Sequence, residues 1–427
     1  MRTVAWCVLM AVFMISPSAW TGFSGIENSR ITPTNVTEPL LVIDEISGGF
    51  GLSVVIRNTG TEEAYDVKWS AEIDSDGFML FGTHREGVIS SIAAGESSVI
   101  TCLFFGVGPA KATVTAEDFT RTALCFFLGP FVPQCLMQKT REEAIPDDAV
   151  KMTPETDVFP PVLHSDAWEE PVPMEGPVNT AGAEDSPFIT PDGSTFFFFF
   201  TPDVEVPPEK QLIDGATGIW WSKKESGIWG EPERIVLHYD VSLDGAPFVE
   251  DNTMWFASAR SGNYGELDFY IAHMHDGTWT DVTNAGEQLN QEYDVGELHI
   301  TADGTEMYCG RGDGDIYVLQ KTADGWSEPM ALPSPVNTPE YSEDQPFITS
   351  DGNELWFTGQ SRLGYPGPAV FRSVKTENGS WSEPEEIISQ FAGEPALDAQ
   401  GNVYFVHHFF SSDMHMIEAD IYVAHRK

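Results

Sequence analysis

The chain has 427 residues, which is too long for one ordinary hydrophobic core, so we expect two domains. Its 66 acidic and 22 basic residues give a net charge of −44, which makes nucleic acid and anionic lipid poor partners. No long stretch carries the 3.6-residue apolar period of an amphipathic helix, and Gly, Pro and aromatic residues are abundant. These features exclude α/β classes and predict an all-β protein.

The N-terminal residues have the layout of a secretory signal peptide. Arg2 precedes the apolar run 4–15, and small and turn-forming residues follow at 16–19. We therefore expect residues 1–22 to be a signal peptide and the protein to be exported, to an extracellular or cell-surface location. An uncleaved segment is the alternative, and it is the only membrane attachment that the sequence predicts.

Residues 38–120 alternate short apolar runs with turns. The runs at 40–46, 51–57, 65–73, 78–81, 87–92, 97–105 and 110–116 predict about seven strands, separated by turns such as Asn58-Thr59-Gly60. Seven strands in a segment of this length are typical of an immunoglobulin-like β-sandwich.

This segment resembles a family of bacterial and archaeal surface modules. The stretch from Val54 to Gly60, followed by Ala64-Tyr65-Asp66-Val67, is similar to modules of the CARDB-like type. The resemblance implies a spacer or adhesive unit without catalytic activity.

Residues 121–164 are expected to form a loop and a linker between the two domains. Cys125 and Cys135 flank Gly129-Pro130 and Pro133, and in an exported protein they would close this loop as a disulfide. Prolines and charges alternate over the rest of the segment, which is typical of a linker.

Residues 165–427 contain internal repeats of about 50 residues. The segment 185–193, Asp-Ser-Pro-Phe-Ile-Thr-Pro-Asp-Gly, matches 344–352, Asp-Gln-Pro-Phe-Ile-Thr-Ser-Asp-Gly, at most positions, and three weaker copies occur. The anchor positions of the copies are 60, 51, 48 and 49 residues apart, and they are Pro187, Pro247, Leu298, Pro346 and Pro395. Five copies predict five repeated units.

Each repeat reads as one four-stranded blade. The first strand is followed by a turn, an aromatic strand, a strand such as Asp420-Ile421-Tyr422, and a Trp-containing strand such as Trp326-Ser327-Glu328-Pro329. The fifth repeat lacks its fourth strand, and a matching Trp168-Glu169-Glu170-Pro171 precedes the first repeat. We therefore predict a five-bladed β-propeller that this N-terminal strand closes beside residues 420–423.

The repeated unit resembles the WD40-like repeats of the TolB-type (PD40) propeller family, over residues 165–427. The Asp-Ile-Tyr and Trp-Ser-Glu-Pro elements carry the resemblance, and the first repeat, with an insertion at 201–218, departs from it most. The resemblance implies an interaction module on an exported protein.

Residues just before the anchors should line the central channel. They are predicted to bind the ligand, and they are Asp185, Glu297, Asp344, Gln345 and Glu394. A cluster of carboxylates suits a cation, and Ca²⁺ is the cofactor that it would accept. The metal ligands themselves are unknown from the sequence, since His273 and His275 make only half of a site.

Two functions are compatible with these residues. We expect a non-catalytic binding protein whose propeller face takes a protein, a glycan or a divalent cation. The alternative is a five-bladed glycoside hydrolase, with catalytic candidates Asp185, Asp244, Glu297 and Glu394 at the channel mouth. The acidic composition also fits simple solubility in salty surroundings, so it does not decide between them.

Overall fold

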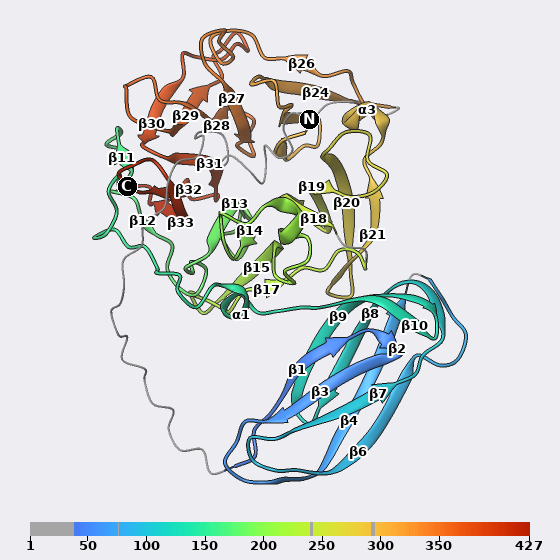
Figure 1. Ribbon diagram of the computed structural model, residues 1–427. Helices are drawn as coiled ribbons and strands as arrows, with labels where there is room; N and C mark the ends of the chain where they lie inside the picture. The colour runs from blue at the N-terminus through green and yellow to red at the C-terminus, as the bar shows by residue number, and fades with distance from the viewer. Residues whose placement is uncertain (1–37, 76, 240–241, 292–294, 324) are drawn as a thin grey trace.

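The computed structural model describes residues 38–427, except for 76, 240–241, 292–294 and 324. The predicted signal peptide lies outside the described residues. Within them the protein is all-β, with three one-turn helices, and it has an elongated N-terminal module beside a larger ring of strand groups (Figure 1). No described helix is long and apolar enough to cross a membrane.

The N-terminal module consists of two sheets that share one core. Its smaller sheet has the order β1 (Leu41–Ser47), β3 (Leu52–Asn58) and β7 (Ser97–Cys102). Its larger sheet has the order β2 (Gly49–Phe50), β10 (Phe131–Met137), β9 (Phe119–Gly129), β8 (Gly106–Ala116), β4 (Ala64–Ser75) and β6 (His84–Ile92), and β5 (Phe78–Met79) pairs with β8. Strand residues alternate between this core and solvent, which explains why the sequence pattern located the strands well.

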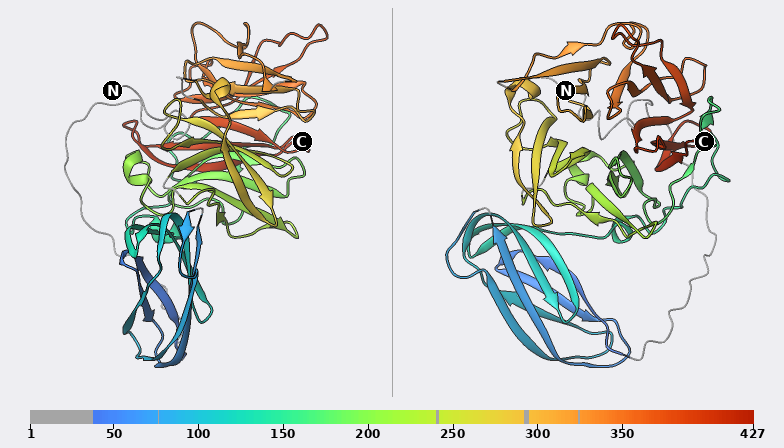
Figure 2. Two further views of the ribbon diagram at one scale, coloured as in Figure 1. Left: turned by 90° about the vertical axis from the view of Figure 1, so that its right-hand side faces the viewer. Right: turned by 180° about the vertical axis from the view of Figure 1, so that it is seen from behind.

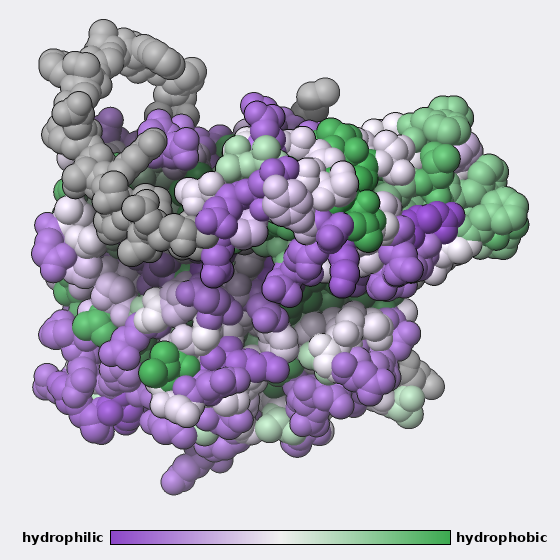
Figure 3. Space-filling view, turned by 90° about the horizontal axis from the view of Figure 1, so that it is seen from below, coloured by the Kyte–Doolittle hydropathy of each residue, from purple (hydrophilic) through white to green (hydrophobic). Residues whose placement is uncertain are grey.

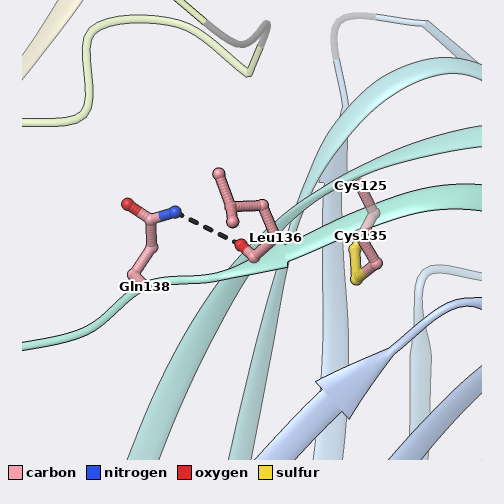
Figure 4. The surroundings of a disulfide bond; sticks show 4 residues. All are labelled: Cys125, Cys135, Leu136 and Gln138. Atoms are coloured by element: carbon pink, nitrogen blue, oxygen red, sulfur yellow. Dashed lines mark hydrogen bonds between the residues drawn. A yellow bond between two sulfur atoms is a disulfide. The ribbon is translucent and has the colours of Figure 1, made fainter. Parts of the chain in front are cut away.

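The expected boundary at residue 120 is wrong, because β9 and β10 belong to the larger sheet. Cys125 and Cys135 are opposite each other in this hairpin, with Cα atoms 4.0 Å apart, and the structure joins them by a disulfide (Figure 4). They therefore link two paired strands of the module and do not close an irregular loop. After β10, Gln138 turns away from the disulfide and its amide donates to the Leu136 carbonyl, 3.2 Å away.

The C-terminal part is a propeller of antiparallel strand groups around a common centre (Figure 1). In the described residues, the first strands of the groups are β13 (Ala183–Ile189), β18 (Leu243–Glu250), β22 (Leu298–Ile300), β27 (Glu343–Ile348) and β31 (Ala392–Leu397). The second strands are β14 (Thr195–Thr201), β19 (Thr253–Ala259), β23 (Glu306–Gly310), β28 (Glu354–Gln360) and β32 (Val403–Phe410). The third strands are β15 (Gly218–Glu225), β20 (Asp268–His275), β24 (Ile316–Thr322), β29 (Pro368–Val374) and β33 (Met416–Ala424).

Shorter elements complete the groups. The outer strands are β16 (Ile228–Trp229), β17 (Glu233–Arg234), β21 (Thr278–Asn284), β25 (Gly325–Trp326), β26 (Met330–Ala331) and β30 (Glu385–Ser389). The helices are α1 (Arg141–Ala144), α2 (Pro208–Gln211) and α3 (Glu287–Asn290). The views in Figure 2 place the N-terminal module against one side of the ring, where Lys139 donates its backbone N–H to the Gly215 carbonyl.

The predicted closing strand is present. β12 (Val172–Pro173) pairs antiparallel with β33, so that Val172 lies opposite Val423, and Trp168 bridges to Arg426. The Trp168 indole is buried, 5.4 Å from the Trp356 ring, and its N–H donates to the Gly401 carbonyl. An early segment thus completes the sheet that holds the last strand.

The linker belongs to the propeller more closely than its composition predicts. β11 (Val162–Leu163) adds an outer strand to β30, so the propeller begins before residue 165. Arg141 of α1 is buried and its guanidinium lies 3.2 Å from the Glu184 carboxylate of β13. The side chain of Arg141 also donates to the carbonyls of Pro177 and Val178.

Asparagine side chains hold neighbouring groups together. Asn179 accepts from the Ile421 N–H and donates to its carbonyl, both at 2.9 Å. Asn290 makes the same pair of bonds with Phe269, and Asn337 makes it with Ile316. In each case the partner follows the Asp of an Asp-Ile-Tyr or Asp-Phe-Tyr element. Asn290 and Asn337 come from the connection after their motif, whereas Asn179 comes from the segment before the first repeat.

Candidate functional site

A bulge in the first strand of most groups turns a side chain toward the channel. The register shifts between Asp185 and Phe188, and equivalent shifts occur in β18, β27 and β31. The residue before each proline has a φ of about +50°, and these residues are Ser186, Ala246, Gln345 and Glu394. Bulges of this kind re-aim a side chain out of the regular alternation.

The bulges surround a small cavity at the centre of the ring. Its volume is about 30 Å³, and its polar lining comes from Ser186, Glu297, Gln345 and Glu394. We call these four residues, with Asp185 and Asp344, the channel cluster. The structure therefore brings together all five predicted ligand-binding residues and adds Ser186.

Hydrogen bonds fix the orientation of the Glu394 carboxylate. Its Oε1 accepts from the Gln345 amide at 2.6 Å, and its Oε2 accepts from the Ser186 backbone N–H at 2.8 Å. The same N–H donates to Asp185 Oδ1 at 2.9 Å, so the two carboxyl groups share one donor. Asp344 Oδ1 accepts in the same way from the Gln345 N–H.

The channel cluster favours protonated carboxyl groups. Burial, and then the nearby charges of Asp185 and Glu297, raise the pKa of Glu394 well above its ordinary value. Burial and the charge of Asp344 do the same for the pKa of Glu297, and burial raises the pKa of Asp344 to about 6. Burial and mutual repulsion therefore disfavour the charged forms of these carboxyl groups.

Two oxygens of the channel cluster have no hydrogen-bond partner in the described part of the chain. They are Ser186 Oγ and Gln345 Oε1, and both residues are at least nine-tenths buried. A cavity of about 30 Å³ with several polar partners is large enough for an ordered water molecule.

Asp244, a catalytic candidate from the sequence, is not part of the channel cluster. Its carboxylate pairs with the Arg260 guanidinium and accepts from the Ser258 hydroxyl at 2.6 Å. The repeats differ here, because Gly245 and Ala246 occupy the two positions before Pro247 and bring no polar side chain to the channel. Asp244 thus holds strands β18 and β19 together.

An aromatic layer lies on one side of the channel cluster. It consists of Phe188, Phe248, His299 and Phe347, one from each of four first strands. The His299 ring centroid is 4.6 Å from that of Phe248 and 4.2 Å from that of Phe347. Burial lowers the pKa of His299 to about 3, so the imidazole is neutral and part of this layer.

Beyond the aromatic layer the channel opens into a cavity of about 960 Å³, which we call the wide mouth. The turns between first and second strands form its wall. Its ionisable lining consists mainly of acids, and they are Asp192, Glu250, Asp251, Asp351, Glu354 and Asp398. Among the described residues that line the wide mouth, Arg426 is the one arginine or lysine. Its guanidinium lies over the Trp168 ring, 4.3 Å from the ring centroid.

Hydrogen bonds favour the charged form of two of these carboxyl groups, whereas burial raises the pKa of Glu250. Hydrogen bonds from the Thr190 and Ser194 hydroxyls lower the pKa of Asp192, and Thr349 does the same for Asp351. Glu354 is paired with the Arg372 guanidinium. Sequence reasoning missed the wide mouth because Asp192, Asp251, Asp351 and Asp398 lie in turns between strands, where Asp is also the ordinary turn residue.

The histidines do not form a metal centre in the described residues. His273 and His275 are exposed on β20, and no group of three or more His, Cys, Asp or Glu side chains within 38–427, as described, is placed to hold a metal. His407 is buried, and its Nε2 lies 2.8 Å from Asp157 of the linker. Sequence reasoning missed this pair because its members are 250 residues apart.

Comparisons with known proteins give only distant likenesses. No protein-family model and no curated protein matches the chain. A solved protein of unknown function from Bacteroides thetaiotaomicron is 13% identical with a TM-score of 0.38, over 93% of this chain and all of that one. The GH43 BlXynB protein from Bacillus licheniformis is 12% identical, also at 0.38, over 58% of this chain and 53% of that one.

A third solved structure, the Hadza microbial sialidase Hz136, is 12% identical with a TM-score of 0.34, over 87% of this chain and 86% of that one. All three TM-scores are below 0.5 and all three identities are below 25%.

Proposed function

We propose that this protein is an exported binding protein whose propeller, of five blades, takes a basic segment of a partner protein in the wide mouth. The observation that carries the proposal is a cavity of about 960 Å³ with an acidic lining. Ligand sites usually measure roughly 300–1,000 Å³, so the wide mouth is large enough for several side chains. The N-terminal module, which we interpret as immunoglobulin-like, is then the stalk.

Electrostatics select the ligand class within the wide mouth. Setting aside Glu354, which Arg372 neutralises, five lining carboxyl groups face one lining base. A cation about 4 Å from one carboxylate gains about 1 kcal/mol in water and about 4 kcal/mol near a protein surface. Several such pairs favour Lys and Arg side chains, whereas the same lining repels an acidic segment or an anionic sugar.

The hydrolase alternative fits the channel cluster less well. One carboxyl group with a raised pKa beside another carboxyl group is what glycoside hydrolysis requires. The cavity beside them is only about 30 Å³, about a tenth of the smallest ordinary ligand site, so a sugar ring does not reach them. The polar side chains around this cavity and its small volume suit a buried water molecule better than a sugar.

Ca²⁺ is not part of the proposal. Burial raises the pKa of Glu297 and of Glu394, which disfavours the charged carboxylates that a cation needs, and no group of three or more His, Cys, Asp or Glu side chains in the described residues is placed to hold a metal. Melting the full chain with Ca²⁺ and with a chelator tests this directly. A calcium-dependent rise that Glu394→Gln abolishes would restore the cation-binding hypothesis.

The binding proposal is tested with a pair of peptides and a pair of variants. A fluorescent oligolysine peptide should bind the full chain, an oligoglutamate peptide should not, and added salt should weaken the binding. Glu250→Gln with Asp251→Asn should reduce the affinity for oligolysine by about tenfold, since two charge pairs near a surface are lost. These positions are chosen because the carboxylates of Asp192 and Asp351 hold their own turns.

Asp276→Asn is the matched control. Asp251 and Asp276 both occupy turns with a φ of about +50°, but Asp276 lies between β20 and β21, outside the wide mouth. Equal loss of oligolysine binding in the control would show that only the general negative charge of the chain attracts the peptide. That result would overturn the assignment of the wide mouth.

A further inference from the structure

One end of the N-terminal module exposes large apolar side chains. We call this set the apolar tip, and its members, each 37–63% exposed, are Phe50, Phe78, Leu80, Phe81, Leu103, Phe105, Val107, Phe126, Leu128 and Phe131. Figure 3 shows apolar side chains gathered where the molecule projects at its right-hand edge. Contiguous apolar patches of this size on a protein surface mark a docking site.

Strand register shows that the apolar tip is continuous. Phe131 of β10 lies opposite Phe50 of β2 and Leu128 of β9. Leu128 lies opposite Val107 of β8, and Val107 lies opposite Phe78 of β5. Neighbouring strands are about 4.8 Å apart, so this row crosses five strands without a gap.

The exposed side chains of the apolar tip are not misplaced core residues. Phe126 and Leu128 of β9 point outward, while Cys125 and Phe127 of the same strand are buried in the core of the module. Further along β8 the outward positions are polar, with Lys111, Thr113 and Thr115. The outer face of the sheet is therefore polar along most of its length and apolar only at this end.

The segments that form the apolar tip contain no acidic residue. This holds for 46–61, 77–85, 97–116 and 119–141, in a chain with 66 acids. The same segments carry Arg57, Arg85, Lys111, Arg121, Lys139 and Arg141. Arg85 lies within the tip, where its guanidinium donates to the Phe81 and Leu103 carbonyls.

We propose that the apolar tip docks the protein on a lipid bilayer by inserting these aromatic and aliphatic side chains among the lipids. A projecting apolar end that carries Arg85 and whose strands contain no acidic residue matches a membrane interface, where apolar groups enter and cations remain at the headgroups. A net charge of −44 would disfavour binding to an anionic membrane only if it were spread evenly over the surface of the protein. Charges on the propeller are screened beyond a Debye length of about 8 Å.

Hydrogen–deuterium exchange of the full chain with phosphatidylcholine vesicles containing one-fifth phosphatidylglycerol tests this docking. Vesicles should slow exchange in 78–81, 103–107 and 128–131, and should leave the propeller unchanged. In flotation, Phe81→Ser with Phe131→Ser should reduce vesicle binding by at least about tenfold, because two large apolar side chains are lost. Residues 1–37 are the same in every variant, so their contribution is constant.

Val99→Ser is the control, since Val99 on β7 is 63% exposed, as Phe81 is, but lies outside the apolar tip. Unchanged exchange at the tip in the presence of vesicles would overturn the proposal. So would light scattering that shows a dimer which the double variant abolishes, because the tip would then bind a second copy. The proposal does not depend on the ligand of the wide mouth, since none of its residues belongs to the propeller.

Discussion

Glu394 shows how burial and neighbouring charges set the protonation of a single residue. Its carboxyl group accepts from the Gln345 amide and the Ser186 N–H, yet burial and two neighbouring acids raise its pKa. The folded protein therefore binds protons at a pH where the unfolded chain has released them. The associated stability is present at low pH and is lost as the pH rises.

The melting temperature should therefore fall between pH 5 and pH 8. Asp344, with a pKa of about 6, contributes on the order of 2–3 kcal/mol that is lost as the pH rises from about 4 to above 6. Glu394→Gln should flatten the profile, because glutamine has no proton to lose, while Glu340→Gln on the surface should not. Thermal unfolding followed by circular dichroism across this pH range tests the prediction. A melting temperature that rises with pH in this range would contradict the raised pKa values.

Arg141 is the second residue whose role can be measured. It is the buried partner of Glu184, and burial raises the pKa of Glu184 to about 8 despite this arginine. Arg141→Met should cost about 3–5 kcal/mol above pH 8, where it leaves a buried carboxylate uncompensated. The loss should be smaller at pH 6, where Glu184 is protonated. Urea unfolding at both values measures the difference, and Arg57→Met, at an exposed ion pair with Asp44, is the control.

At the scale of elements, the early segments of the propeller hold it closed. A chain beginning at residue 138 keeps α1, β11 and β12, and we expect it to melt with the full-length propeller. A chain beginning at residue 151 loses Arg141 and should be less stable, and one beginning at residue 175 also loses Trp168 and β12 and should be the least stable. Equal melting temperatures for the chains beginning at residues 138 and 175 would show that ring closure contributes nothing to the stability of the propeller.

Most elements could be predicted because their information is local. Alternation marks β3 and β8, and the copies around Pro187 and Pro346 mark the first strands of the propeller. The closing strand was predictable because Trp168 repeats the Trp-Ser-Glu-Pro pattern. The contacts of Arg141 with Glu184 and of His407 with Asp157 were not, since one charged pair between distant residues leaves no periodic signal.

The sequence predicted which residues form the channel cluster better than it predicted their protonation or the size of the cavity. The repeats locate Glu297, Gln345 and Glu394 at equivalent positions, and ring closure brings equivalent positions together. Asp244 lies outside the cluster for a physical reason, because its carboxylate pairs with Arg260, which directly follows β19. Whether a cavity is 30 or 960 Å³ depends on side-chain packing, and no spacing in the sequence reports it.

At the scale of the whole molecule, charge is separated along the chain. The 277 residues from 151 onward carry 48 acids and 13 bases, whereas the segments of the apolar tip carry no acid at all. One net charge therefore describes neither part, and the exclusion of lipid partners from composition applies to the propeller only. We propose two partners for these two surfaces, a basic protein segment for the wide mouth and a bilayer for the apolar tip.

The pairing of β12 and β13 with β33 has a consequence for the order of events during synthesis. β33 covers residues 416–424, and it pairs with segments more than 230 positions earlier. While the chain is being synthesised, the N-terminal module can fold as soon as it emerges from the ribosome. The ring must wait, with the edges of β13 and β12 uncovered, until its last strand arrives. A premature stop codon that removes only this strand would therefore leave an open propeller with unpaired strand edges. Such a chain would be prone to aggregate, and cellular quality control would treat it as misfolded.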